Sequence, residues 1–92
     1  MSKKIRLYKP FVSLAKNKKY SVYVVGKNDK IKLIHFGDKR YKHYYDKLGF
    51  YKKLNHLDKK RRDAYYARHG STRDFNTAKY WANRILWPTG RL

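Results

Sequence analysis

Residues 20–36, with the sequence YSVYVVGKNDKIKLIHF, decide the fold of this chain. β-Branched and aromatic side chains alternate between two faces from Tyr20 to Val25, and a second alternating run extends from Ile31 to Phe36, as is typical of strands. Between the two runs, Gly26 and Asn28 suit the left-handed positions of a tight loop. The sequence therefore predicts a β-hairpin, and other parts of the chain must cover its apolar face because an isolated hairpin is marginally stable in water.

Two helices are predicted between residues 40 and 70. Asp58 is a typical N-cap for a helix over residues 59–69, and Gly70 suits the position that follows the last turn. Upstream, a short helix is expected within residues 40–53, because apolar and aromatic residues recur there at helical spacing: Tyr41, Tyr44, Tyr45 and Leu48.

A final helix is predicted to begin after Asn76 or Thr77 and to end before Pro88. Its apolar face is the clearest in the chain and consists of Ala78, Trp81, Ala82, Ile85 and Leu86. Trp81 and Trp87 lie on or beside this face, so we expect both to anchor the core rather than to stack on a ligand.

Composition limits the chain to one small domain. Its 92 residues are too few for a second folded unit, while 41% hydrophobic and 17% aromatic residues are too many for a solvated tail. The chain has no Cys, so neither disulfides nor thiolate metal sites can supplement the core. We predict an α+β domain over residues 20–92, with the hairpin packed against two or three short helices, preceded by a basic extended arm over residues 1–19.

The expected arm combines two kinds of side chain. It has no acidic residue and carries seven basic ones, Lys3, Lys4, Arg6, Lys9, Lys16, Lys18 and Lys19. A free arm of this kind repels itself and becomes ordered only on a surface. Spaced apolar residues accompany the charges, and we interpret them as anchors in a groove of a neighbouring protein: Ile5, Leu7, Phe11, Val12 and Leu14.

The net charge indicates an anionic partner. The chain has 25 Lys and Arg against 6 Asp and Glu, a net charge of +19, whereas a charge of magnitude ~2 to 8 is enough for solubility. Lys outnumbers Arg about two to one, which suits neutralisation of phosphates more than bidentate reading of bases. Besides the arm, the candidate residues for binding nucleic acid or an acidic partner are Lys59, Lys60, Arg61, Arg62 and Arg68.

No pattern in the sequence indicates catalysis, a metal or a cofactor. Glycine-rich phosphate loops and nucleophile elbows are absent, and the 4 His residues are scattered with no helical pair among them. No window approaches the ~18 consecutive apolar residues of a membrane helix. We therefore expect a non-enzymatic protein with no cofactor, no metal, no small-molecule substrate and no membrane insertion.

Four blocks of the sequence carry a resemblance to a known family. They are KYSVYV at residues 19–24, IHFGD at residues 34–38, the spaced pattern from His56 to His69, and the pattern from Asn76 to Trp87. In this order they resemble a family of small basic proteins of unassigned function that are encoded by large (giant) DNA viruses and some tailed phages. The resemblance implies a virion-associated protein, present in the host cytoplasm or nucleus during assembly, and it supplies no catalytic residue.

Two functions are compatible with these features. The first is a virion structural protein, a minor capsid or core component that bridges neighbouring capsid proteins and acidic surfaces. The alternative is an architectural, sequence-independent DNA-binding or genome-packaging protein, and a ribosomal-type RNA binder comes third. We prefer the capsid component at this stage because a purely electrostatic DNA arm would not need the apolar anchors.

Overall fold

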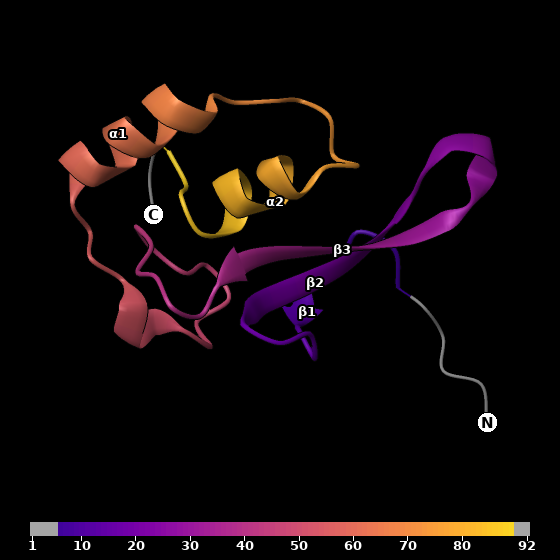
Figure 1. Cartoon of the computed structure of the whole chain (residues 1–92), viewed down its shortest axis with the longest axis horizontal. Coiled ribbons are helices and arrows are strands. Elements are labelled where there is room, and N and C mark those ends of the chain that lie inside the picture. Colours follow the sequence, from indigo (N-terminus) through magenta and orange to yellow (C-terminus); the bar gives the residue numbers. More distant parts are fainter. Residues whose placement is uncertain (1–5, 90–92) are drawn as a thin grey trace.

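The predicted hairpin forms the centre of the structure. The computed structural model describes residues 6–89, in which three strands and two helices make an α+β fold, as predicted (Figure 1). The strands are β1 (Phe11–Val12), β2 (Lys18–Val25) and β3 (Ile31–Asp38), and they form an antiparallel sheet in the order β1-β2-β3. The helices are α1 (Lys59–His69) and α2 (Ala78–Ile85).

The register of the hairpin places the apolar residues of both strands on one face. Tyr20 lies opposite Phe36, and Val22 lies opposite Ile34. All four side chains are buried, as the alternating pattern requires. The loop between the strands places Asn28 and Asp29 at φ values of 61° and 57°, a left-handed conformation that Asn and Asp adopt more readily than most residues. Gly26, which was also predicted to adopt it, does not have a positive φ.

Part of the segment predicted as an arm pairs with the hairpin, at residues 11–12 and 18–19. Phe11 pairs with Ser21 and Val12 pairs with Tyr20, so this segment adds a third strand. β2 also begins at Lys18, earlier than predicted. A strand of 2 residues is too short to show alternation in the sequence, which is why the pattern did not reveal β1.

α2 covers the apolar face of the hairpin. Its N-cap is Thr77, whose side chain accepts a hydrogen bond from the Tyr80 N–H. Trp81, which is 6% exposed, and Ile85 pack against the buried residues of β2 and β3. The indole N–H of Trp81 donates to the Phe75 carbonyl oxygen at 2.8 Å, so its polar edge is satisfied inside the core. The prediction that Trp81 anchors the core is confirmed.

α1 is attached to the chain that follows α2. The predicted cap is confirmed, since the Asp58 carboxylate accepts hydrogen bonds from two N–H groups of the first turn. No residue of α1 is buried. The helix is held by Tyr65, whose ring stacks on Trp87 with centroids 4.3 Å apart, and by Tyr66, whose hydroxyl donates to the Trp87 carbonyl oxygen at 2.6 Å. Both helices lie on the same side of the sheet (Figure 1).

The helix expected within residues 40–53 does not form. This stretch is irregular apart from a 3₁₀ helix over Lys52–Leu54. The N–H groups of Tyr44 and Tyr45 both donate to the Leu86 carbonyl oxygen, each at 3.1 Å, instead of to carbonyls one turn earlier in their own segment. The prediction was wrong because hydrogen bonds to the end of α2 replace those of a helix, so the tyrosine spacing does not define a helical face.

Candidate nucleic-acid interface

A cleft lined by cations and aromatic rings lies between α1 and the residues that follow β3. We call it the basic–aromatic cleft, and its volume is about 480 Å³. None of the described residues that line it is acidic. The lining comprises Arg40, Tyr41 and Lys42 on the loop, Arg61, Ala64 and Arg68 on α1, and His56 and Trp87.

Arg40 is held at the rim of the cleft by Asp38, the last residue of β3. The Asp38 carboxylate accepts hydrogen bonds from the backbone N–H, Nε and Nη2 of Arg40 at 2.9, 3.0 and 2.7 Å. These bonds lower the pKa of Asp38 and raise the pKa of Arg40, so both groups stay charged. Because Asp38 neutralises Arg40, this pair adds no net positive charge to the cleft. Its part is to hold the rim in place.

Tyr41 presents its ring to solvent while its backbone is fixed. The residue is 64% exposed, and the Arg40 guanidinium carbon lies 5.8 Å from the centroid of its ring. Its N–H donates to the Asp38 carbonyl oxygen at 3.1 Å, and its own carbonyl oxygen accepts from Lys19 Nζ at 2.8 Å. The backbone from which the ring projects is therefore fixed at the cleft rim.

Lys19 lies inside the protein and not on its binding surface, which corrects its assignment as a partner-binding residue. It is 1% exposed, and its ammonium donates to Nδ1 of His43 at 2.7 Å. Nε2 of His43 lies 2.6 Å from Asn55 Oδ1, and the same oxygen accepts from the Asp46 N–H at 2.8 Å. Because Asn55 Oδ1 can only accept, the His43 proton is on Nε2 and Nδ1 is free to accept from Lys19.

Burial shifts the pKa values of this pair. Desolvation lowers the pKa of Lys19 to about 8, opposed by the charges of Asp46 and Asp38. Desolvation also lowers the pKa of His43 to about 4, and the positive charge of Lys19 acts in the same direction. A cavity of about 450 Å³ that adjoins the cleft is lined by both residues. The pair supports the loop wall of the cleft from beneath.

The α1 wall carries two arginines on one face. Arg61 and Arg68 are seven residues apart, close to two helical turns, so their side chains point in nearly the same direction. Ala64 lies between them and leaves space above the helix. Arg61 Nε is 3.7 Å from the Asp58 carboxylate, a loose ion pair, and neither Lys42 nor Arg68 forms an ion pair with any residue in the range 6–89.

His56 and Trp87 complete the lining of the cleft. Trp87 stacks on Tyr65, and its ring centroid lies 5.3 Å from that of His56. The Asp58 N–H donates to His56 Nδ1 at 2.9 Å, so the proton of the neutral ring is on Nε2. Burial lowers the pKa of His56, and the charge of Arg61 adds to this, so the ring is neutral at pH 7. His56 Nε2 is buried and has no hydrogen-bond partner in the described part of the chain.

Two of the basic residues predicted from the sequence, Arg61 and Arg68, line the cleft. Arg62 points elsewhere, since its Nη1 donates to the Pro88 carbonyl oxygen at 3.1 Å and its guanidinium carbon lies 4.5 Å from the centre of the Tyr44 ring. Lys3 and Lys4 are outside the described residues. The remaining predicted residues are exposed but do not line the cleft: Arg6, Lys9, Lys16, Lys18, Lys59 and Lys60.

The predicted apolar anchors of the arm differ in how far they are buried and in whether they belong to the sheet. Phe11 and Val12 are part of the sheet, and the Phe11 ring stacks on Tyr23 with centroids 5.6 Å apart. Leu7 is half-buried and forms an isolated bridge with Tyr23. Leu14 is 99% exposed, and Ile5 lies outside the described residues.

Apart from Ala64 and Trp87, four residues that line the cleft are not among the binding residues predicted from the sequence: Arg40, Tyr41, Lys42 and His56. A signal was present, because basic and aromatic residues alternate over residues 40–42 directly after the second strand. That stretch was interpreted as helix, which would have pointed successive side chains in different directions. His56 carried no recognisable signal.

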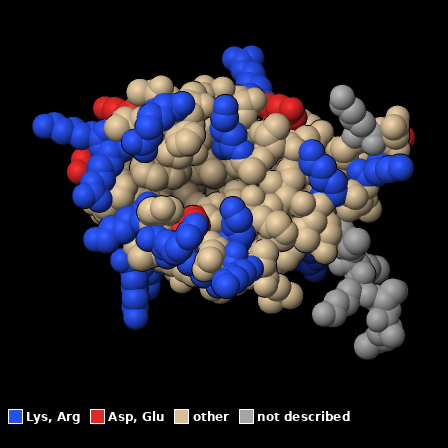
Figure 2. Space-filling view, viewed as in Figure 1, with Lys and Arg blue, Asp and Glu red and all other residues tan. Residues whose placement is uncertain are grey.

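The charge of the surface matches this arrangement. Figure 2 shows Lys and Arg side chains over the visible face, most densely at the end that carries α1 and the residues before it, with few Asp among them. Within residues 6–89 only two ion pairs form, Arg40–Asp38 and Arg61–Asp58. Most positive charges are therefore available to an external anion.

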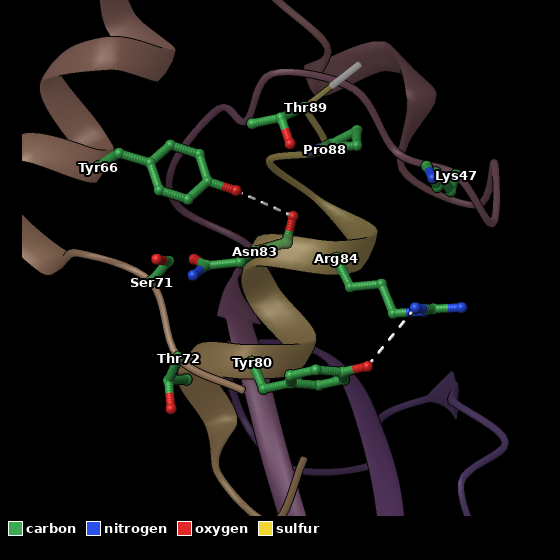
Figure 3. Close-up of a pocket in the computed structure, with 9 residues that line it drawn as sticks. All are labelled: Lys47, Tyr66, Ser71, Thr72, Tyr80, Asn83, Arg84, Pro88 and Thr89. Atoms are coloured by element: carbon green, nitrogen blue, oxygen red, sulfur yellow. Dashed lines mark hydrogen bonds between the residues drawn. The ribbon is translucent and has the colours of Figure 1, made fainter. Parts of the chain in front are cut away.

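A second depression, also of about 480 Å³, lies beside Tyr66 of α1. Figure 3 shows Tyr66 above it and Tyr80, Asn83 and Arg84 of α2 around it, with Lys47 to one side. The Tyr66 hydroxyl, which donates to the Trp87 carbonyl oxygen, also lies 3.4 Å from the Asn83 carbonyl oxygen. Arg84 Nη1 donates to the Tyr80 hydroxyl at 3.5 Å, a long hydrogen bond within α2.

Comparisons of the chain with protein-family models, with curated proteins and with solved structures find no match. No helix among residues 6–89 is long and apolar enough to cross a membrane. In the same range, no three His or Asp side chains come together as a metal site would require. Function is therefore inferred from the cleft and the charge around it, and the resemblance to viral proteins stays a prediction.

Proposed function

We propose that the protein binds nucleic acid, without sequence preference, through the basic–aromatic cleft. The observation that carries the proposal is that Lys42, Arg61 and Arg68 line the same concave site as an exposed ring, Tyr41, and that no acidic side chain lines it. Cations that track a phosphate backbone beside aromatic rings that stack on bases are the usual features of such sites. A net charge of +19 adds long-range attraction to any polyanion.

The contacts suit the backbone of a nucleic acid better than the edges of its bases. Neither helix of the described chain presents a row of Arg, Asn and Gln that could enter a groove: α2 turns its apolar face to the sheet, and α1 offers Arg61 and Arg68 beside a loop. Such contacts fix position and affinity but carry no sequence information. This favours the architectural or packaging role that the sequence analysis placed second.

The test is the salt dependence of binding by variants of equal charge. Replacing Lys42, Arg61 and Arg68 by Gln should weaken binding of a labelled oligonucleotide at 50 mM salt by at least tenfold and reduce the slope of log K against log [salt] by about 2 to 3. The matched control replaces three exposed lysines outside the cleft, Lys52, Lys53 and Lys79, by Gln. Equal effects of the two triple variants would show that diffuse charge, and not the cleft, binds the oligonucleotide.

A second function, a structural component of a virion, is favoured by the side of the sheet that faces away from α1 and α2. Three apolar residues are exposed there, Phe11, Ile31 and Leu33. Val12 and Leu14 are exposed as well, but Val12 pairs with Tyr20 and so lies on the opposite face. Contiguous exposed apolar residues on a small protein mark surfaces that bind other proteins. Retention of the protein in purified shells after nuclease digestion of the genome would support this role over genome packaging, and its release with the nucleotides would argue against it.

A further inference from the structure

We infer that the basic–aromatic cleft accepts a single strand of nucleic acid and not a duplex, an inference that rests on the proposed function. The cleft and the adjoining cavity, at about 480 and 450 Å³, have the size of sites that enclose one small molecule, roughly 300 to 1,000 Å³. A nucleotide unit is of that size. The major groove of a duplex alone is about 12 Å wide, so a duplex can touch the rim but cannot enter.

Tyr41 is the ring on which a base would stack. Its backbone is held on two sides, by the Asp38 carbonyl oxygen and by Lys19 Nζ, while 64% of the residue remains exposed. The backbone of this segment is therefore ordered on folding, and little further backbone entropy is lost when a base stacks. In a duplex the faces of interior bases are covered by their neighbours, so only an unpaired or terminal base can use this ring.

Trp87 has a different part in the cleft. One face of its ring is covered by Tyr65, with an angle of 5° between the planes, and His56 packs beside it at a tilt of 58°. At least one face of Trp87 is therefore closed to a base by Tyr65. The aromatic recognition of a base depends on Tyr41.

The Nε2–H of His56 is buried beside the cleft and offers no donor to a bound strand. It is shielded from water and has no acceptor among residues 6–89, so folding leaves one hydrogen bond unmade. Lys42, Arg61 and Arg68 supply the charge that attracts a phosphate to the cleft.

The inference is tested with a labelled oligo(dT) and a duplex of the same length, both titrated with the full chain at low salt. The wild-type protein should prefer the single strand, and Tyr41→Ala should weaken single-strand binding by about 5- to 100-fold with little effect on the duplex. Tyr41→Phe should bind as the wild type does, since stacking needs the ring and not the hydroxyl. The matched control is Phe50→Ala, which removes a 71% exposed ring outside the cleft and should change neither affinity.

The outcomes separate this inference from the proposed function. Equal affinity for the two oligonucleotides, or equal losses from Tyr41→Ala and Phe50→Ala, would overturn the single-strand inference. If the Gln triple variant of the cleft still weakens binding in that case, nucleic-acid binding through the cleft stands. Thermal melts of each variant show whether the fold is retained, and Tyr41→Phe provides a variant that keeps the packing of the ring.

Discussion

The lysine–histidine pair beneath Tyr41 is unusual because two basic side chains are buried together. Lys19 Nζ and His43 Nδ1 are 2.7 Å apart, a distance that requires the imidazole to be neutral. Asn55 fixes the tautomer that accepts from Lys19, and the Tyr41 carbonyl oxygen takes a second ammonium proton. Folding thus depends on the protonation state of one imidazole ring.

We predict that the free energy of unfolding decreases as the pH falls from about 6.5 to about 4. The pKa of His43 is about 4 in the folded chain and about 6.5 in the unfolded chain, so between these values only the unfolded state takes up the proton. Below pH 4 both states are protonated and the loss is complete. Urea denaturation at a series of pH values measures this, and His43→Gln should flatten much of the decrease, with His56 contributing the remainder. An identical profile for His43→Gln would contradict the assignment.

At the scale of single elements, the close approach of β3 to the end of α2 depends on a glycine. Gly37 has a φ of 77°, and a Cβ placed on it would lie 2.6 Å from Leu86 Cδ1 and 3.1 Å from Lys19 Cβ. Gly49 has a similar φ of 85°, yet nothing lies within 4 Å of a Cβ there. The two positions separate backbone strain from crowding.

We predict that Gly37→Ala destabilises the protein by about 2 to 5 kcal/mol, the sum of left-handed backbone strain and overpacking. Gly49→Ala should show the strain alone, about 1 to 2 kcal/mol. Chemical denaturation of the two variants gives the comparison. Losses of the same size would mean that Leu86 moves aside at little cost.

α2 contributes the largest single anchor of the core. We predict that Trp81→Ala costs about 3 to 5 kcal/mol, a large part of the stability of a domain of this size. Its indole is buried and hydrogen-bonded to Phe75, whereas the exposed ring of Phe50 should be removable at little cost, which makes Phe50→Ala the control. If Trp81→Ala melts like the wild type but loses oligonucleotide binding, Trp81 is a stacking residue and the core is misassigned.

The elements that could be predicted from the sequence are those with local signals. Three predictions rest on interactions between residues close in sequence: the alternation over residues 20–36, the Asp58 cap and the apolar face that includes Trp81. All three are confirmed. The loop over residues 40–53 could not be predicted, because its hydrogen bonds go to the distant end of α2. For the same reason, only part of the cleft could be predicted. Arg61 and Arg68 share the face of a helix that local signals predict, whereas Tyr41 and His56 come close to them only through tertiary packing.

At the scale of the whole molecule, repulsion between like charges opposes folding. The chain has a net charge of +19, and residues 6–89 form two ion pairs. Salt screens this repulsion and also weakens attraction to phosphates, so stability and affinity should respond to salt in opposite directions.

We predict that the midpoint of thermal unfolding rises by roughly 5 to 10 °C between 20 and 500 mM NaCl, equivalent to about 1 to 2 kcal/mol. Oligonucleotide affinity should fall over the same range. Differential scanning fluorimetry and fluorescence anisotropy in the same buffers measure the two quantities. A midpoint that stays constant or falls would show that the charges are too widely spaced to oppose folding.

α1 forms one wall of the cleft and is held by few contacts, so it can detach from the rest of the protein while the core stays folded. α1 buries no residue and is held through Tyr65, Tyr66 and the 87–88 segment, whereas the facing wall is bonded to the core through Lys19. Segments with little buried surface open locally, without global unfolding. Amide hydrogens of α1 should therefore exchange with deuterium much faster than those of β2 and β3. A strand bound across both walls would slow exchange in α1 selectively, so protection of this helix would record occupancy of the cleft.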